Sequence, residues 1–431
     1  MSKMEMMARD KKKGALVPRL RFPEFRDAGK WEMRYGNDLF DNIINKNQNF
    51  DLPILAITQE YGAIPRSTIE YNVSVTEKSI ENYKVVNIGD FIISLRSFQG
   101  GIEYSHFCGL CSPAYIILRK KVILNDVFFK FFFKSEHLIS RLNVNIEGLR
   151  DGKMITYKQF SEVLLPFPSP AEQQRIADCL SSLEERIAAE TNKLDALKDH
   201  KKGLLKQLFP AEGETLPQLR FPEFRDAGEW GQAPLGELLL SQPDYGLNAP
   251  AVPYTSSLPT YIRITDISEE GQFIAEKKVS VDVVAVPENC LHPGDIVLAR
   301  TGASVGKAYK YNENDGILVF AGFLIRVKPN WKKINSNFLF NFLFTKRYWD
   351  WVVLTSPRSG QPGINSSEYA TLPVPTPPSD GDMQCEQQRI ADCLSSLDEL
   401  IAAQTQKINL LKDHKKGLMQ QLFPCIDEVQ A

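Results

Sequence analysis

The chain has 431 residues, which is enough for more than one domain. Its 51 Lys and Arg side chains nearly balance its 53 Asp and Glu side chains, so net charge neither favours nor excludes a nucleic-acid partner. The longest apolar runs are far shorter than a membrane-spanning helix requires. Only local clusters and repeated segments can therefore indicate a function.

Residues 1–17 are polar and include the basic run Lys11–Lys13, so we expect a frayed tail whose lysines are solvated or touch phosphate. No apolar stretch follows this run, and we expect no secretory signal. The seven cysteines are odd in number and scattered, which suits reduced thiols in a cytoplasm. Cys108 and Cys111 form a single CxxC motif near His106. No further ligands lie close in sequence, so we expect no metal site.

The first globular region opens with the motif LRFPEFRDAG at Leu20–Gly29 and is expected to contain both strands and helices. Asn125 and Asp126 can cap a phenylalanine-rich helix, Phe128–Leu142, whose rings we expect in a core rather than stacked on bases. The expected strands are Pro53–Thr58, Phe91–Leu95, Ala114–Arg119 and Val163–Pro166.

Residues 171–210 form a long helix without internal proline, and the same sequence returns 214 residues later, ending near Pro424. Apolar residues recur at alternating steps of three and four, which is the spacing of a coiled-coil seam. The seam of the first copy is Ile176, Leu180, Leu183, Ile187, Glu190, Leu194, Leu197, Lys201, Leu204 and Leu208, and that of the second is Ile390, Leu394, Leu397, Ile401, Gln404, Ile408, Leu411, Lys415, Leu418 and Leu422.

A second globular region lies between the two long helices and also begins with LRFPEFRDAG, at Leu219–Gly228. An aromatic helix is expected at Phe338–Trp351, and a glycine-containing loop, Ser359–Gly363, closes the region. The expected strands are Tyr261–Ile267, Asp295–Ala299 and Gly322–Val327, and the segment Leu372–Pro375 follows the closing loop.

Each long helix is apolar along one stripe only, so it needs a partner, and the other copy can provide one. A parallel pair would place Lys201 against Lys415, so we expect an antiparallel pair. The register we expect sets Glu190 opposite Lys415 and Lys201 opposite Gln404. The alternative is that Glu190 and Lys201 point to solvent and specify no register.

The expected fold is therefore a pair of α/β (mixed α+β) globular domains separated by two long helices that form an antiparallel intramolecular coiled coil, with a pseudo-twofold internal repeat. The expected segments are a tail at 1–17, a first domain at 18–170, a first spacer helix at 171–210, a second domain at 211–378, a second spacer helix at 379–424 and a tail at 425–431.

The segment Gly302–Lys307 resembles a phosphate-binding loop but is one residue short between its glycines and has Ala308 after the lysine. We therefore exclude nucleotide hydrolysis there. Glycine-rich backbone beside arginine, lysine and glutamine still suits contacts with DNA phosphates and base edges. A similar cluster, Arg96–Gly101, lies at the matching place in the first domain. The simpler interpretation, a surface hairpin with incidental charge, is weakened because both domains carry such a cluster.

The candidate DNA-binding residues are Arg96, Ser97, Gln99, Gly100, Arg150, Lys153, Arg263, Arg300, Thr301, Ser304, Lys307, Arg358, Ser359 and Gln361. No pattern typical of a hydrolase, a metalloprotease, a calcium loop or an amino-methyltransferase is found, and the sequence predicts no catalytic set.

The duplicated helix sequence EQQRIADCLSSL…LKDHKKGL, with the lead-ins Leu165–Pro168 and Leu372–Pro375, resembles the specificity subunit of type I restriction–modification systems over nearly the whole chain. Gly89-Asp90 and Gly294-Asp295 ahead of the two loops support this resemblance.

The resemblance implies that the chain is a non-catalytic subunit whose domains each recognise one half of an asymmetric, bipartite site in double-stranded DNA. It also implies that the helices set the spacing and dock two modification subunits, which bring S-adenosylmethionine and methylate adenine. No cofactor is then bound by this chain itself. Two restriction subunits, which are ATP-dependent translocases and nucleases, join where they are present. The competing hypotheses are a degenerate DNA enzyme and a coiled-coil adaptor that binds only proteins.

Overall fold

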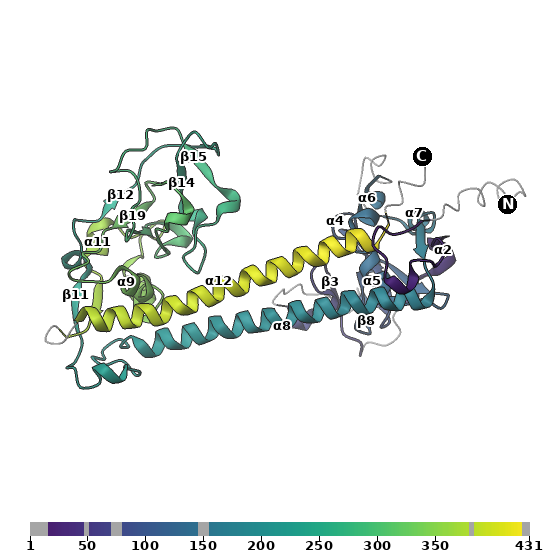
Figure 1. Ribbon diagram of the computed structural model, residues 1–431, viewed down its shortest axis with the longest axis horizontal. Coiled ribbons are helices and arrows are strands. Elements are labelled where there is room, and N and C mark those ends of the chain that lie inside the picture. The colour runs from purple at the N-terminus through teal and green to yellow at the C-terminus, as the bar shows by residue number, and fades with distance from the viewer. Residues whose placement is uncertain (1–15, 47–50, 70–79, 145–154, 379–382, 425–431) are drawn as a thin grey trace, which may run out of the picture. The chain divides into compact units, whose positions relative to one another are not determined.

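The computed structural model describes residues 16–46, 51–69, 80–144, 155–378 and 383–424 (Figure 1). The predicted tails fall almost wholly outside these ranges. The chain divides into two compact units, Met1–Thr191 with Gln406–Ala431 and Asn192–Thr405. No helix in the described ranges combines the length and apolar content needed to cross a membrane.

The first unit is built on an antiparallel sheet in the order β2–β9–β6–β7, with the strand pairs β3–β4, β5–β8 and β1–β10 beside it. The strands are β1 (Glu32–Tyr35), β2 (Phe40–Ile43), β3 (Leu55–Thr58), β4 (Gly62–Pro65), β5 (Lys84–Val86), β6 (Phe91–Ile93), β7 (Glu103–Tyr104), β8 (Gly109–Cys111), β9 (Ile116–Lys120) and β10 (Leu164–Phe167). The helices are α2 (Gly36–Leu39), α4 (Ser97–Gly100), α5 (Asp126–Phe132), α6 (Glu136–Val144) and α7 (Tyr157–Ser161).

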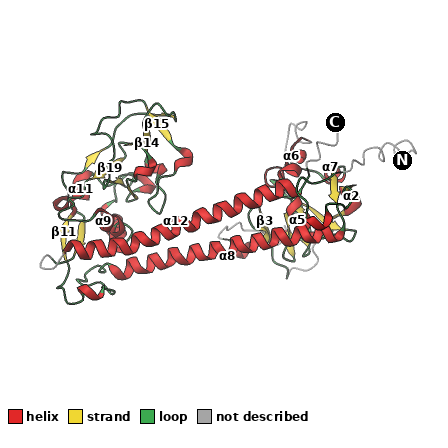
Figure 2. Ribbon diagram, viewed as in Figure 1, coloured by secondary structure: helices red, strands yellow, loops and turns green. Residues whose placement is uncertain are grey.

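The second unit repeats this plan with one sheet in the order β12–β19–β16–β17 and has a second sheet in the order β13–β15–β14–β18. The strands β14 and β15 of the second sheet and β19 of the first are labelled in Figure 2. The strands are β11 (Gly231–Pro234), β12 (Asp244–Tyr245), β13 (Ala251–Pro253), β14 (Thr260–Ile262), β15 (Val279–Val281), β16 (Ile296–Ala299), β17 (Ala308–Lys310), β18 (Leu318–Phe320), β19 (Leu324–Val327) and β20 (Pro373–Thr376). The helices are α9 (Ser336–Phe342), α10 (Lys346–Thr355) and α11 (Ser366–Ala370), with single-turn helices η5 (Ile264–Asp266) and η7 (Gly302–Ser304).

The repeated Gly-Asp dipeptides hold equivalent places before the central strands β6 and β16. Gly89 and Gly294 adopt φ values of 92° and 93°, a left-handed conformation that favours glycine. The two carboxylate oxygens of Asp90 accept hydrogen bonds from two nitrogens of the Arg119 guanidinium, at 2.7 and 2.6 Å. The pattern therefore marks the same turn in both domains.

Both predicted aromatic helices are broken in two, which the periodicity did not indicate. In the first unit the break falls between α5 and α6, where the Ser135 hydroxyl accepts from the Leu138 N–H. In the second it falls between α9 and α10, where Thr345 accepts from the Tyr348 N–H. Serine and threonine favour such caps over helix interiors. The rings themselves are core, as expected, and those of the first unit are Phe128, Phe129, Phe131, Phe132 and Phe133.

The expected strand Tyr261–Ile267 is also wrong in its second half. The ladder ends with β14 at Ile262, and η5 follows. Asp266 accepts from both the backbone N–H and the guanidinium of Arg263. This local hydrogen bonding offers the backbone an alternative to the sheet.

The long helices are α8 (Pro170–Leu208, 39 residues) and α12 (Met383–Leu422, 40 residues), and both units contain part of each. In the first unit, Leu180 of α8 shares a core with Leu422 and with Phe423 beyond the end of α12. In the second unit, Leu394 of α12 shares a core with Leu208 of α8. Each domain therefore packs on the start of one long helix and the end of the other.

The LRFPEFRDAG motif is the partner of the repeated helix start. Arg21 forms a bidentate ion pair with Glu172 at 2.7 Å, and both side chains are buried. The hydrogen bond to Glu172 raises the pKa of Arg21. Arg220 and Glu386 repeat the pair at 2.8 Å in the second unit. In each unit, therefore, the two duplicated sequences contact one another.

A second repeated contact joins the helix start to the cap of the aromatic helix. The Gln173 side-chain oxygen accepts from the Asn125 N–H at 2.9 Å, while Asn125 caps α5. Gln387 accepts from the Asn335 N–H at 2.7 Å, while Asn335 caps α9. The glutamine therefore orients the phenylalanine-rich core on the long helix.

The helices run antiparallel, but the expected register is wrong. Lys415 pairs with Glu184 at 2.5 Å instead of with Glu190, which pairs with Lys407. In the second unit Lys201 pairs with Asp398 at 2.5 Å. Glu184 and Asp398 lie beside the apolar seam, and a long lysine side chain reaches them from within it. Matching polar seam positions with one another therefore predicted the wrong partners.

This register predicts the outcome of a charge swap. Both Lys130 and Lys415 pair with Glu184, so the substitution Glu184→Lys alone places three positive charges together. We expect Glu184→Lys or Lys415→Glu to destabilise the first unit by about 1 kcal/mol each. The double variant Glu184→Lys/Lys415→Glu should recover most of this loss in urea unfolding followed by circular dichroism.

The matched control is Glu190→Lys/Lys415→Glu, which swaps the pair that the wrong register joins. We expect no recovery there. Recovery in this control but not in the Glu184 swap would contradict the register.

Candidate nucleic-acid interface

The structure brings the two predicted loops of the second domain together, although they are far apart in sequence. The Gly302 N–H donates to the Pro362 carbonyl at 2.9 Å, and the Ile364 N–H donates to the Arg300 carbonyl at 2.8 Å. Thr301 also bridges to Gly363. The segments 300–307 and 356–364 therefore form one surface.

The approach of these loops requires glycine at position 302. Gly302 has a φ of 73°, and a Cβ atom there would lie 2.7 Å from the side-chain nitrogen of Gln361. This places the exposed amide of Gln361 directly over the backbone of η7. The glycine that resembled part of a phosphate loop thus serves the contact between two loops.

Several predicted cations of this domain are already paired with carboxylates. Arg263 binds Asp266 through two nitrogens at 2.8 Å, and Arg358 binds Glu368. Lys307 lies 2.6 Å from Glu269. Contact with DNA phosphates would have to compete with these partners. Ser304 and Thr301 are partly buried, and Ser359 is exposed, in the same surface.

Arg300 differs, because within the described ranges it has no ion pair with a carboxylate. Its guanidinium carbon lies 4.8 Å from the centre of the Tyr245 ring, and one nitrogen reaches the Gly322 carbonyl at 3.5 Å. Stacking on an aromatic ring orients the planar fork while leaving donors free. Arg300 is therefore the candidate of this loop whose guanidinium is oriented without being neutralised by a carboxylate.

Tyr245, which the sequence analysis did not single out, is the ring on which Arg300 stacks. It lies in β12, and its hydroxyl accepts from the Ser366 N–H at 3.1 Å. Burial raises the pKa of Tyr245, but the hydrogen bond from Ser366 and the charge of Arg300 outweigh it, so its pKa is lowered. Only the pairing of β12 in the sheet brings this residue near Arg300, which is why no spacing rule identifies it.

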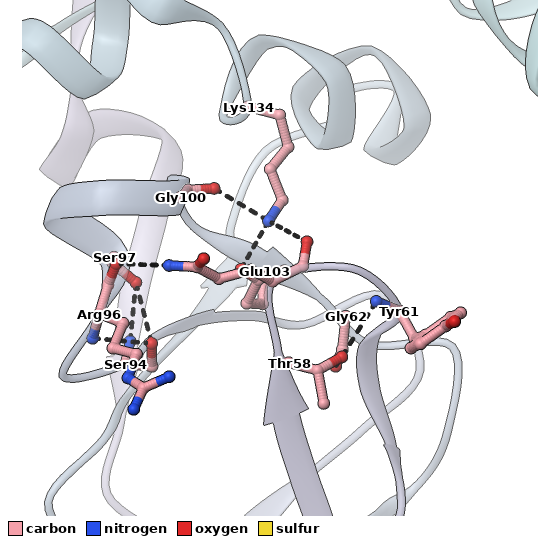
Figure 3. A network of polar contacts seen from close by, with 10 residues as sticks. Thr58, Tyr61, Gly62, Ser94, Arg96, Ser97, Gly100, Glu103 and Lys134 are labelled. Atoms are coloured by element: carbon pink, nitrogen blue, oxygen red, sulfur yellow. Dashed lines mark hydrogen bonds and ion pairs between the residues drawn. The ribbon is translucent and has the colours of Figure 1, made fainter. Parts of the chain in front are cut away.

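In the first domain the candidate cluster forms the short helix α4 and the turn before it (Figure 3). Arg96 and Gln99 are exposed. Ser97 is buried, and its hydroxyl accepts from the Ser94 N–H at 2.9 Å, so its geometry indicates a structural role within the turn. Gly100 is partly buried. Arg150 and Lys153 lie outside the described residues.

Within the described residues the cysteines are free thiols. Cys108 and Cys111 are not joined in a disulfide, and burial raises the pKa of Cys111 to about 12. A protonated thiol is a poor metal ligand. Within the described residues, no group of three or more His, Cys, Asp or Glu side chains is arranged to hold a metal ion.

Two domains on a shared helix pair, with differing cationic loops at equivalent places, define a recognition protein. Residues 29–199 and 248–413 match the family described as type I restriction modification DNA specificity domain. The chain therefore belongs to this family, and its globular domains are DNA target recognition domains.

Known proteins resemble the chain over nearly its full length. The type I restriction enzyme MjaVIII specificity subunit of Methanocaldococcus jannaschii is 22% identical, covering 94% of this chain and 93% of that protein. The crystal structure of the S subunit from M. genitalium is 16% identical, with a TM-score of 0.54, and the match covers 95% of this chain and 99% of that one. A chain of a type I restriction–modification complex is 18% identical with a TM-score of 0.55, covering 91% and 97%. The solved structures support the fold.

The stacked geometry of Arg300 predicts that charge alone cannot replace it. Arg300→Lys keeps the cation but loses the planar fork, so we expect discrimination between the cognate sequence and a single-base mismatch to fall by about 1–3 kcal/mol. Competition binding of the chain, together with its modification subunit, to matched and mismatched duplexes measures this.

Arg263→Lys provides the comparison, because the fork of Arg263 is occupied by Asp266. We expect a smaller change there. An equal loss of affinity for matched and mismatched DNA in Arg300→Lys would show that Arg300 contacts only phosphate.

Proposed function

We propose that each domain recognises one half of a bipartite DNA site and that α8 and α12 set the distance between the halves. The observation that carries this proposal is the reciprocal anchoring of each domain on the start of one helix and the end of the other. A domain held at two helix ends cannot rotate freely about either helix. Such anchoring suits a spacer between half-sites about one turn of DNA apart, roughly 34 Å.

The half-sites should differ in sequence. The candidate recognition loops of the two domains occupy equivalent turns but differ in sequence, which is RSFQGG at 96–101 in the first domain and RTGASVGK at 300–307 in the second. The second domain has a four-stranded sheet in the order β13–β15–β14–β18, whereas the described residues of the first domain form the separate strand pairs β3–β4 and β5–β8. Different donors and acceptors recognise different base edges, so the whole site is asymmetric.

The chain itself supplies recognition, and partner subunits supply the chemistry. We infer that two modification subunits dock on the long helices and bring S-adenosylmethionine to methylate adenine, with two restriction subunits joining where they are present. Leu400 and Leu410 of α12 support docking, because these large apolar side chains lie outside the seam and are 54% and 62% exposed. Exposed apolar side chains beyond a helix seam suit a protein partner.

The spacing role is tested by lengthening both helices together. Thr191 and Thr405 are repeat equivalents, and a heptad inserted after each keeps the phase of the seam. Seven residues add about 10 Å, or roughly three base pairs, to the helix pair. We expect methylated sites with an unchanged pair of half-sequences and a longer gap between them, measured by mapping methylated adenines.

A heptad inserted after Thr191 alone is the control, because it leaves the added residues unpaired. We expect loss of a defined gap in that variant. Altered half-sequences with an unchanged gap in the double insertion would contradict the spacing role.

A further inference from the structure

The first domain contains a cavity of about 830 Å³, and most of the residues that line it are not among the predicted DNA contacts. It lies between the β3–β4 hairpin and the turn that precedes α4. The polar and aromatic residues around it include Gln59, Tyr61, Arg66, Arg96 and Tyr115. Only Arg96 was expected from the sequence to bind DNA. The hairpin therefore forms one wall of the cavity, beside the turn Ser94–Arg96, which is named the recognition turn.

The tip of this hairpin is held by its own hydrogen bonds. The Thr58 hydroxyl accepts from the Tyr61 N–H at 3.0 Å and donates to the Gly62 carbonyl at 3.1 Å. Gly62 has a φ of 70°, which closes the turn. The side chains of Gln59 and Tyr61 remain exposed, with Tyr61 60% exposed. A rigid backbone thus presents an amide and a phenol to solvent.

Lys134 ties the hairpin tip to the recognition turn (Figure 3). Its ammonium donates to the Gly100 carbonyl at 3.0 Å and to the Gln59 carbonyl at 3.3 Å. The Gln59 side chain in turn donates to the Arg96 carbonyl at 3.3 Å. One lysine from the junction of α5 and α6 therefore sets the position of both segments.

The charge of Lys134 is held in place by a buried carboxylate. Glu103 is 2% exposed, and its Oε1 lies 2.5 Å from the Lys134 ammonium. Burial raises the pKa of Glu103, while the nearby lysine opposes that rise. Among the described residues its Oε2 has no hydrogen-bond partner, so Lys134 is the principal compensation for this buried charge. Removing the lysine would leave both loops without their common contact.

The exposed groups around the cavity are those that recognise base edges. Arginine and glutamine pair with guanine and adenine through two hydrogen bonds, and a carboxylate such as Glu60 accepts from cytosine. Arg66 adds a buried guanidinium nitrogen that has no hydrogen-bond partner within the described part of the chain. Two arginines and one acidic residue, Glu60, line the cavity, so the positive charges outnumber the negative one. Such a concave surface suits a polyanion.

We propose that the hairpin tip Gln59–Tyr61 is a further base-reading element of the first domain and that Lys134 is the residue that positions it beside Arg96. The inference rests on the proposed function of the domain as the reader of one half-site. It adds residues from a strand hairpin to the loop that the sequence identifies. Gln59 contacts base edges through the second N–H and the oxygen of its amide, which the hydrogen bond to the Arg96 carbonyl does not use, whereas Lys134 acts only through the two loops.

The test compares half-sites within one molecule. The full chain and its modification subunit are expressed in a host, and methylated adenines are mapped for wild type and for Gln59→Ala, whose truncated side chain is exposed. We expect discrimination at one or two positions of one half-site to fall about tenfold or more, with the other half-site unchanged.

Lys134→Met should relax several positions of the same half-site, because both loops lose their shared contact. Lys120→Met is the matched control, since Lys120 of the same domain pairs with Asp126 on the surface and touches neither loop. We expect the control to keep the wild-type motif. Lys134→Arg keeps the charge and should recover part of the discrimination.

The outcomes separate the inference from the proposed function. An unchanged motif in Gln59→Ala, or relaxation of both half-sites together, overturns the inference while the wild-type bipartite motif still stands. Absence of a bipartite motif in the wild type overturns the proposed function itself. Relaxation of a single half-site by Gln59→Ala and Lys134→Met, but not by Lys120→Met, supports the inference.

Discussion

The buried ion pair between Arg21 and Glu172, with its repeat Arg220 and Glu386, is the contact on which the rest of the structure depends. Each arginine also donates to the carbonyls at the end of its own LRFPEFRDAG motif, as Arg21 does to Gly29 at 3.0 Å. The motif is thereby folded onto the start of a long helix. Loss of one partner would leave a buried charge uncompensated, at a cost of about 3–5 kcal/mol. In each unit, therefore, the LRFPEFRDAG motif and the repeated helix start join the domain to its long helix. The rest of the two domains differs in sequence.

The repeat, the helices and their seam could be predicted because a spacing of three and four residues is visible in sequence. The register could not, because Lys415 reaches Glu184 beside the seam instead of a seam position. Ser135 and Thr345 divide the aromatic helices, and a local cap is a weaker signal than a run of phenylalanines. The helix bounds agree with the expected ones to within a few residues.

The surroundings of the candidate DNA-binding loops could be predicted only in part. Sequence locates the loops that carry arginine and glutamine, but sheet pairing decides which residues lie beside them. Tyr245 reaches Arg300 across strands, and Gln59 reaches the Arg96 turn from a hairpin. The partners of the arginines then distinguish side chains of equal charge. Arg263 forms an ion pair with Asp266, whereas Arg300 stacks on an aromatic ring. Residue type alone therefore does not distinguish a cation that is already paired with a carboxylate from one that is not.

Recognition of two halves of one DNA site by two dissimilar domains is tested by long-read mapping of methylated adenines in a host that carries the wild-type chain and its modification subunit. We expect two unlike half-sequences separated by a gap of constant length and indifferent composition. A single continuous motif, or methylation that is the same with and without this chain, would contradict it.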